Sequence, residues 1–201
     1  MGTQARIVIL GGGFGGLFTA LELSGSAEVT LVSSGPQFEF KPLLYEYLSG
    51  EVEEWHIAPT YRELLDDSVR FIQGDATEID FETQQVVLNA GQTYAFDVLV
   101  LAVGGVTNYA GVEGAEQYAL PFRSLADADR LRARMVQALD AVPPDLSPQE
   151  ARNALSFAVV GAGASGVELS TKMADLLNDA VSRRALPGEP RVMVIEMGDR
   201  V

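Results

Sequence analysis

The stretch RIVILGGGFGG, Arg6 to Gly16, decides the fold of this 201-residue chain. Its first five residues are a short apolar run rich in β-branched side chains, and its last six fit the pattern G-x-G-x-x-G. Apolar residues then recur at helical spacing over 16–24, and a second β-branched run fills 28–32. A strand, a glycine loop, a helix and a second strand in this order predict a β-α-β unit.

Each glycine of this loop has a separate task in a nucleotide-binding turn. Gly11 allows the tight turn, Gly13 lets a pyrophosphate approach backbone N–H groups at the positive end of the helix, and Gly16 lets helix and strand pack closely. A glycine turn that binds nothing is the alternative. We expect a dinucleotide at the whole loop, which comprises Gly11, Gly12, Gly13, Phe14, Gly15 and Gly16.

The residue after the second strand of this unit is Ser33. An acid at this place would accept hydrogen bonds from the adenosine ribose. Serine can also bind the ribose, although more weakly, or it can be a plain turn residue. Both interpretations of Ser33 remain open from the sequence.

A second match to the same pattern follows in the same context. Gly161, Ala162, Gly163, Ala164, Ser165 and Gly166 lie between a predicted strand over 155–160 and a predicted helix from 163 to about 177. The next strand, 191–196, ends in Glu196, which we expect to bind an adenosine ribose, with an ordinary strand-end acid as the alternative. Residues 178–189 read as an insertion. The carboxylate of Glu196 would repel the 2′-phosphate of NADPH and so favour NADH.

The remaining segments complete an α/β fold with two dinucleotide-binding (Rossmann-like) domains. Short helices are predicted over 42–48 and 60–65, a strand over 69–73, an antiparallel ribbon from 77, and a buried strand over 98–102. Ser124 and Asp127 predict a capping box for a helix that runs to about 141, and 142–148 reads as a connection across a domain boundary. We expect an FAD-binding domain over 1–120 and an NAD(P)H-binding domain over 121–201. Because a doubly wound sheet needs a further crossover, we expect the amino-terminal part of a longer protein.

Composition excludes several classes of function. The net charge of −14 and the pI near 4.4 disfavour a nucleic-acid partner. The absence of cysteine excludes disulfides, thiolate metal sites and electron transfer through a cysteine pair, and we predict no metal site. No apolar run is long enough to span a membrane and no signal segment precedes the first strand, so we expect an intracellular protein. No catalytic role is expected for His56, the single histidine.

Together with the two loops, several motifs resemble the type II NADH dehydrogenases, single-chain FAD enzymes that reduce membrane quinones. These motifs are FKPLLY at 40–45 with Gly50, IAP at 57–59, FDVLVLAVG at 96–104, and FRSL at 122–125. The stretch 38–52 is similar to the branch of cyanobacteria and plastids that acts on demethylphylloquinone or plastoquinone. Because some members of that branch use NADPH, the choice between NADH and NADPH stays open.

The resemblance implies roles for further residues. It makes Lys41 and Pro42 neighbours of the flavin, Ala76 a backbone contact of the adenine, and Ala102, Val103 and Gly104 an FAD contact in which Val103 replaces a common threonine. In the second loop Ala164 and Ser165 replace a common Pro-Thr pair, and Ser165 can keep the polar role. Glu168 matches a catalytic glutamate near the nicotinamide. The alternatives are a solvated first-turn acid for Glu168 and an exposed lysine for Lys41.

The resemblance implies a whole protein that is cytoplasmic and peripheral on the inner face of a plasma or thylakoid membrane, attached through regions beyond this sequence, with a homodimer left open. The 201 residues alone are expected to bind FAD weakly or not at all and not to reduce quinone. One rival is a flavin-dependent reductase of a ferredoxin or rubredoxin, although the acidic chain offers no basic docking face. The other is a nucleotide-binding fragment or redox sensor without turnover.

Overall fold

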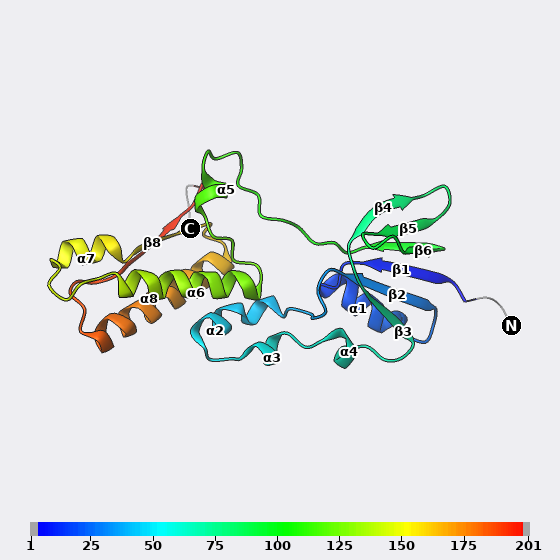
Figure 1. The fold of residues 1–201 in the computed structure, drawn as a ribbon, viewed down its shortest axis with the longest axis horizontal. Helices are drawn as coiled ribbons and strands as arrows, with labels where there is room; N and C mark the ends of the chain where they lie inside the picture. The colour runs from blue at the N-terminus through cyan, green and yellow to red at the C-terminus, as the bar shows by residue number, and fades with distance from the viewer. Residues whose placement is uncertain (1–3, 199–201) are drawn as a thin grey trace. The chain divides into compact units, whose positions relative to one another are not determined.

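The computed structural model describes residues 4–198, which divide into two compact units. The first unit contains residues 4–40 and Trp55–Ala115, and the second contains Lys41–Glu54 and residues 116–198. Figure 1 shows the elements of both units. The sequence prediction divided the chain once, near residue 120, whereas the structure also assigns Lys41–Glu54 to the second unit.

The first unit is built on a parallel sheet with strand order β3-β2-β1-β7. Its strands are β1 (Arg6–Leu10), β2 (Glu28–Ser33), β3 (Val69–Gln73) and β7 (Val98–Leu101), and α1 (Phe14–Leu23) connects the first two. Ile9, Ala20 and Leu31 have no exposed surface, because the sheet and α1 bury their apolar faces against each other. This is the predicted β-α-β unit.

An antiparallel ribbon covers the other face of this sheet. It consists of β4 (Ala76–Asp80), β5 (Gln85–Leu88) and β6 (Thr93–Ala95), and it lies on the side opposite α1 (Figure 1). Val86 and Leu88 of the ribbon pack against Val8 and Leu10 of the sheet in one buried cluster. The Asp80 carboxylate accepts the N–H groups of the turn that joins β4 to β5, which explains a tight turn there.

The prediction of a buried last strand is wrong for β7. Val98 is 48% exposed and Leu101 is 60% exposed. In the described residues β7 is an edge strand that pairs only with β1, so part of its apolar surface stays uncovered. A run of apolar residues indicates a strand, but it does not indicate how many neighbours the strand has.

Short helices lead from the first unit to the second and back. A 3-10 turn, η1 (Lys41–Leu43), precedes α2 (Leu44–Ser49), and α3 (Glu54–Ile57) precedes α4 (Tyr61–Leu64). Thr60 and Glu63 form a capping box at α4. Later in the chain, α5 (Ala115–Tyr118) spans the next boundary between the two units.

The second unit repeats the first in kind. A parallel pair, β8 (Ser156–Val160) and β9 (Arg191–Ile195), is connected by α8 (Ala164–Arg184), and α6 (Leu125–Asp140) and α7 (Pro148–Ala154) complete the unit. Leu155 and Leu177 lie without exposed surface in its core. The predicted insertion after 177 is in part a continuation of α8, which extends to Arg184.

Two further predictions for this unit need correction. The connection over 142–148 does not cross a domain boundary, because it lies inside the second unit between α6 and α7. At the start of α6, Ser124 caps the helix by accepting from Asp127 N–H, as predicted. The Asp127 carboxylate, however, accepts from Arg123 N–H, one residue before the position that a reciprocal capping box requires.

Polar contacts hold α2 in the second unit. Tyr47 donates its hydroxyl to Asp129 over 2.9 Å, and Arg132 lies over the Tyr47 ring while it donates to the carbonyl groups of Tyr47 and Leu48. Lys172 pairs with Glu51 just beyond α2 at 2.8 Å. These contacts, with buried Leu48, explain why the segment packs with helices far away in the sequence. In residues 4–198 no helix is long and apolar enough to cross a membrane.

Candidate nucleotide-binding sites

The first glycine loop has the geometry of a pyrophosphate-binding turn. Gly11 has a φ of +103°, which only glycine adopts without strain, and its N–H donates to Val32 over 2.8 Å. A Cβ on Gly16 would lie 1.7 Å from the Gly11 carbonyl oxygen, so helix and loop could not approach this closely with any other residue. Among the described residues other than its two chain neighbours, none has an atom within 4 Å of a Cβ built on Gly13, the residue that precedes α1. The space beside Gly13 is therefore open for a ligand.

The second loop repeats this geometry in the second unit. Gly161 has a φ of +101°, and its N–H donates to Ile195 over 2.8 Å. A Cβ on Gly166 would lie 1.8 Å from the Gly161 carbonyl oxygen, while Gly163 has open space at the start of α8 among the described residues. Ala164 and Ser165 form the exposed first turn of α8. Each loop thus presents the first backbone N–H groups of a helix and the positive end of its dipole.

The acid at the end of β9 is tied to its loop. Glu196 accepts from the N–H of Ala162 over 2.6 Å and from the N–H groups of Met197 and Gly198. These backbone hydrogen bonds, first that of Ala162, lower the pKa of Glu196 below its ordinary value. The carboxylate therefore remains ionised at neutral pH beside the second loop.

The end of β2 carries no acid, and a tyrosine lies there instead. Tyr61, which is 2% exposed, donates its hydroxyl to the Gly12 carbonyl over 2.7 Å and lies 3.4 Å from the Ser33 hydroxyl. Burial, the largest cause, raises the pKa of Tyr61, so the hydroxyl keeps its proton. The sequence prediction missed Tyr61. The only signals were a glycine at position 12 and the missing acid at position 33.

The segment after β7 lies against the first loop. Ala102 donates its N–H to Leu10 over 2.8 Å, and a Cβ on Gly11 would lie 2.2 Å from the Ala102 carbonyl oxygen. Val103 is 72% exposed and Gly104 has a φ of +70°. Gly15 also faces Ala102. The structure thus brings these residues together beside the turn.

The other residues predicted for the FAD site are Ala76, Lys41 and Pro42. Ala76 begins β4, two residues after Gly74, whose N–H donates to Ser33 over 2.9 Å. Lys41 and Pro42 form η1 in the second unit, directly after Phe40, whose ring lies 5.5 Å from that of Phe14.

Glu168 lies on α8, two residues after the last glycine of the second loop. Its side chain is exposed. It lies in the first turns of α8, which begins at the second loop. Within residues 4–198 no group of acidic, histidine or cysteine side chains could hold a metal ion.

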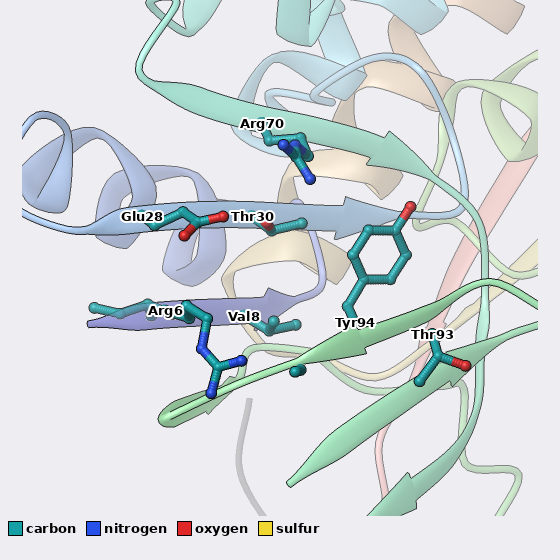
Figure 2. Close-up of a pocket in the computed structure, with 9 residues that line it drawn as sticks. Arg6, Val8, Glu28, Thr30, Arg70, Thr93 and Tyr94 are labelled. Carbon is teal, nitrogen blue, oxygen red and sulfur yellow. The ribbon is translucent and has the colours of Figure 1, made fainter. Parts of the chain in front are cut away.

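A surface cavity of about 240 Å³ lies on the ribbon side of the first unit. Arg6, Glu28, Arg70 and Tyr94 are among the residues that line it (Figure 2). Arg6 and Glu28 begin β1 and β2, so the cavity lies at the amino ends of the strands, away from the glycine loop. Dinucleotides bind at the carboxyl ends of parallel strands, and this cavity is therefore a separate feature.

Comparison with known proteins assigns the chain to a family. The model of the pyridine nucleotide-disulphide oxidoreductases matches residues 5–201. The chain belongs to this family. The predicted fold class, an α/β fold with two dinucleotide-binding units and an antiparallel ribbon, is confirmed by the sheets and by the structural relatives.

Within the pyridine nucleotide-disulphide oxidoreductases, the chain is similar to proteins named as quinone reductases. It is 38% identical to the demethylphylloquinone reductase NdbB of Synechocystis, over 98% of this chain and 48% of that protein. It is 32% identical to the type II NADH:quinone oxidoreductase NdhA of Mycobacterium tuberculosis, over 100% of this chain and 45% of that protein. The chain thus spans less than half the length of these relatives.

The chain is also similar to solved structures of NDH2. The NDH2 structure from Plasmodium falciparum in complex with RYL-552 superimposes with a TM-score of 0.81 and 28% identity, over 98% of this chain and 42% of that chain. A second NDH2 structure from the same organism is a complex with NADH, with a TM-score of 0.78 and 29% identity over 90% of this chain and 39% of that chain. The resemblance to type II NADH dehydrogenases expected from the motifs is confirmed.

Proposed function

We propose that the whole protein is an FAD-dependent oxidoreductase that transfers a hydride from NADH or NADPH to flavin and then electrons to a quinone. The observation that carries the proposal is a pair of glycine loops with the same geometry, each at the start of a helix and each in its own unit. Two such sites allow one protein to hold a flavin and a nicotinamide at once. The names of its relatives support quinone as the acceptor.

The first loop fits the pyrophosphate of FAD. The open space beside Gly13 and the start of α1 provide backbone donors, and Ala102, Val103 and Gly104 would line the same site. Lys41, Pro42 and Ala76 are proposed as further neighbours of the flavin or its adenine. When bound, FAD supplies the chemistry that accepts a hydride and releases electrons.

The second loop would hold the nicotinamide dinucleotide. Gly163, Ala164 and Ser165 would place its pyrophosphate at the start of α8. Glu196 would accept hydrogen bonds from the adenosine ribose, and its negative charge would favour NADH over NADPH. Glu168 is proposed to orient the nicotinamide and to hold a proton at its carboxylate during transfer. The protein's part is chiefly to position these groups.

The proposed acceptor is a quinone, and association with the membrane that holds the quinone belongs to the same proposal. The location that follows is the cytoplasmic side of a plasma or thylakoid membrane, and a homodimer is compatible with it. A reductase of ferredoxin or rubredoxin is the second candidate. The net charge of −14 disfavours it, because an acidic iron–sulfur protein needs a basic docking face.

The experiment that tests the proposal is visible absorbance of the protein purified with added FAD, followed by anaerobic addition of NADH and then NADPH. We expect bound flavin bands that bleach with at least one donor and return when a soluble quinone is added. Flavin that bleaches but is reoxidised only by a ferredoxin or rubredoxin would favour the second candidate. Failure of the whole protein to bind flavin would contradict the proposal.

A further inference from the structure

The two β-α-β units of this chain can be compared position by position. Gly11 N–H donates to Val32 and Gly161 N–H donates to Ile195, both over 2.8 Å. The residues that follow these strand positions are Ser33 and Glu196, so the two side chains occupy equivalent places. By the same alignment, Gly12 of the first loop is equivalent to Ala162 of the second.

The equivalent places are tied to their loops by different chemistry. In the second unit one side chain connects the end of the strand to the loop, since the Glu196 carboxylate accepts from Ala162 N–H over 2.6 Å. The Ser33 side chain is shorter, and the Tyr61 hydroxyl lies between it and the loop, 2.7 Å from the Gly12 carbonyl oxygen and 3.4 Å from Ser33 Oγ. The group bound to the second loop, the Glu196 carboxylate, is a charged acceptor. The group bound to the first loop, the Tyr61 hydroxyl, is a neutral donor.

Packing holds the Tyr61 hydroxyl in this place. Its ring is stacked on Phe71 of β3 with 4.5 Å between the ring centroids, and it belongs to the buried cluster under α1. The residue is 2% exposed, and it begins α4, whose start is secured by the capping box of Thr60 and Glu63. A phenol held on a fixed ring loses little conformational entropy when it forms its hydrogen bond.

The identity of residue 12 follows from the same contact. A Cβ on Gly12 would lie 1.9 Å from the Tyr61 hydroxyl oxygen and 2.8 Å from Ser33 Oγ. The equivalent residue of the second loop, Ala162, carries a Cβ and has a carboxylate, not a phenol, beside it. The glycine at position 12 and the tyrosine at position 61 therefore depend on each other, although 49 positions separate them.

We propose that Tyr61 and Ser33 form a neutral tether that replaces the strand-end carboxylate in the first nucleotide site. Tyr61 is its positioning residue, because its hydroxyl orients the Gly12 peptide within the pyrophosphate loop. A phenol has one proton to donate, and it goes to the Gly12 carbonyl. Ser33 can then donate to the phenol oxygen and accept from a ribose hydroxyl of the ligand. The proposal rests on the proposed function only in naming FAD as that ligand.

The test compares Tyr61→Phe, Ser33→Ala and the double variant with Tyr94→Phe, which removes a phenol hydroxyl elsewhere in the same unit. We expect Tyr61→Phe to weaken FAD binding about tenfold, which is the effect of one lost hydrogen bond. Ser33→Ala should cause little further loss once Tyr61 is replaced, and NADH affinity should be unchanged. Equal FAD affinities of Tyr61→Phe and Tyr94→Phe, or equal losses of FAD and NADH affinity, would overturn the tether.

A second measurement needs no ligand, so it separates failure of the tether from failure of the proposed function. Amide hydrogen exchange over residues 12–15 should become at least several-fold faster in Tyr61→Phe than in Tyr94→Phe. Gly12→Ala should also lower the melting temperature, and the loss should be smaller in the Tyr61→Leu background, where the clashing atoms are absent. Unchanged exchange, or an equal loss from Gly12→Ala in both backgrounds, would refute the tether even if FAD binds normally.

Discussion

Replacing single glycines of the first loop separates its structural role from its binding role. A Cβ on Gly16 would lie 1.7 Å from the Gly11 carbonyl oxygen and 3.4 Å from a methyl group of Ile9. Since neither backbone can move without opening the turn, we expect Gly16→Ala to destabilise the first unit by on the order of 3 kcal/mol, the upper part of the range for overpacking. For a unit of about 100 residues this corresponds to a fall of roughly 12 to 24 °C in its melting temperature.

Gly13→Ala is the matched variant. Among the described residues other than its chain neighbours, none has an atom within 4 Å of the new Cβ, and the φ of −68° at Gly13 suits alanine. We expect a change in stability below about 1 kcal/mol, because only the helix cap is affected. The methyl group would nevertheless occupy the space proposed for the pyrophosphate and should weaken FAD binding more than tenfold.

The assay is thermal unfolding by circular dichroism together with FAD titration of both variants. A Gly16→Ala protein as stable as the unmodified chain would refute the argument from close packing. A Gly13→Ala protein that binds FAD with unchanged affinity would refute the assignment of the open space to the pyrophosphate.

Three further predictions concern charged groups. The bonds from Arg6 hold the pKa of Asp97 at about 2, below its ordinary value of 3.8, so the stability that this carboxylate contributes is fully present above about pH 4 and is lost as the pH falls towards 2. Asp97→Asn should therefore flatten the pH dependence of the melting temperature in that window, and an unchanged slope would contradict this. Glu196→Gln should shift the ratio of NADPH to NADH affinity towards NADPH by about tenfold, the scale of one nearby like charge, as measured by titration; the reasoning fails if the ratio stays constant. Glu168→Gln should slow the bleaching of bound flavin by NADH about tenfold or more with little change in NADH affinity, and equal rates would leave Glu168 a solvated acid.

The sequence alone determined the β-α-β units because their signals are local. The strands predicted over 6–10 and 69–73 have the same bounds in the structure, since short β-branched runs bounded by turn residues define them. The glycine loops could be predicted in the same way. A positive φ at Gly11 and the close approach of Gly16 are demands of the backbone itself, and only glycine satisfies both.

Only the tertiary structure decided the features that depend on distant partners. The exposure of β7 follows from its place at the edge of the sheet, which its apolar run does not reveal. The segment Lys41–Glu54 packs with the second unit through Asp129, Arg132 and Lys172, far from it in sequence. Tyr61 reads as an ordinary aromatic residue until the fold places its hydroxyl beside Gly12. Periodicity reports which residues lie on one face of an element, but hydrogen bonds and packing across the fold decide what that face meets.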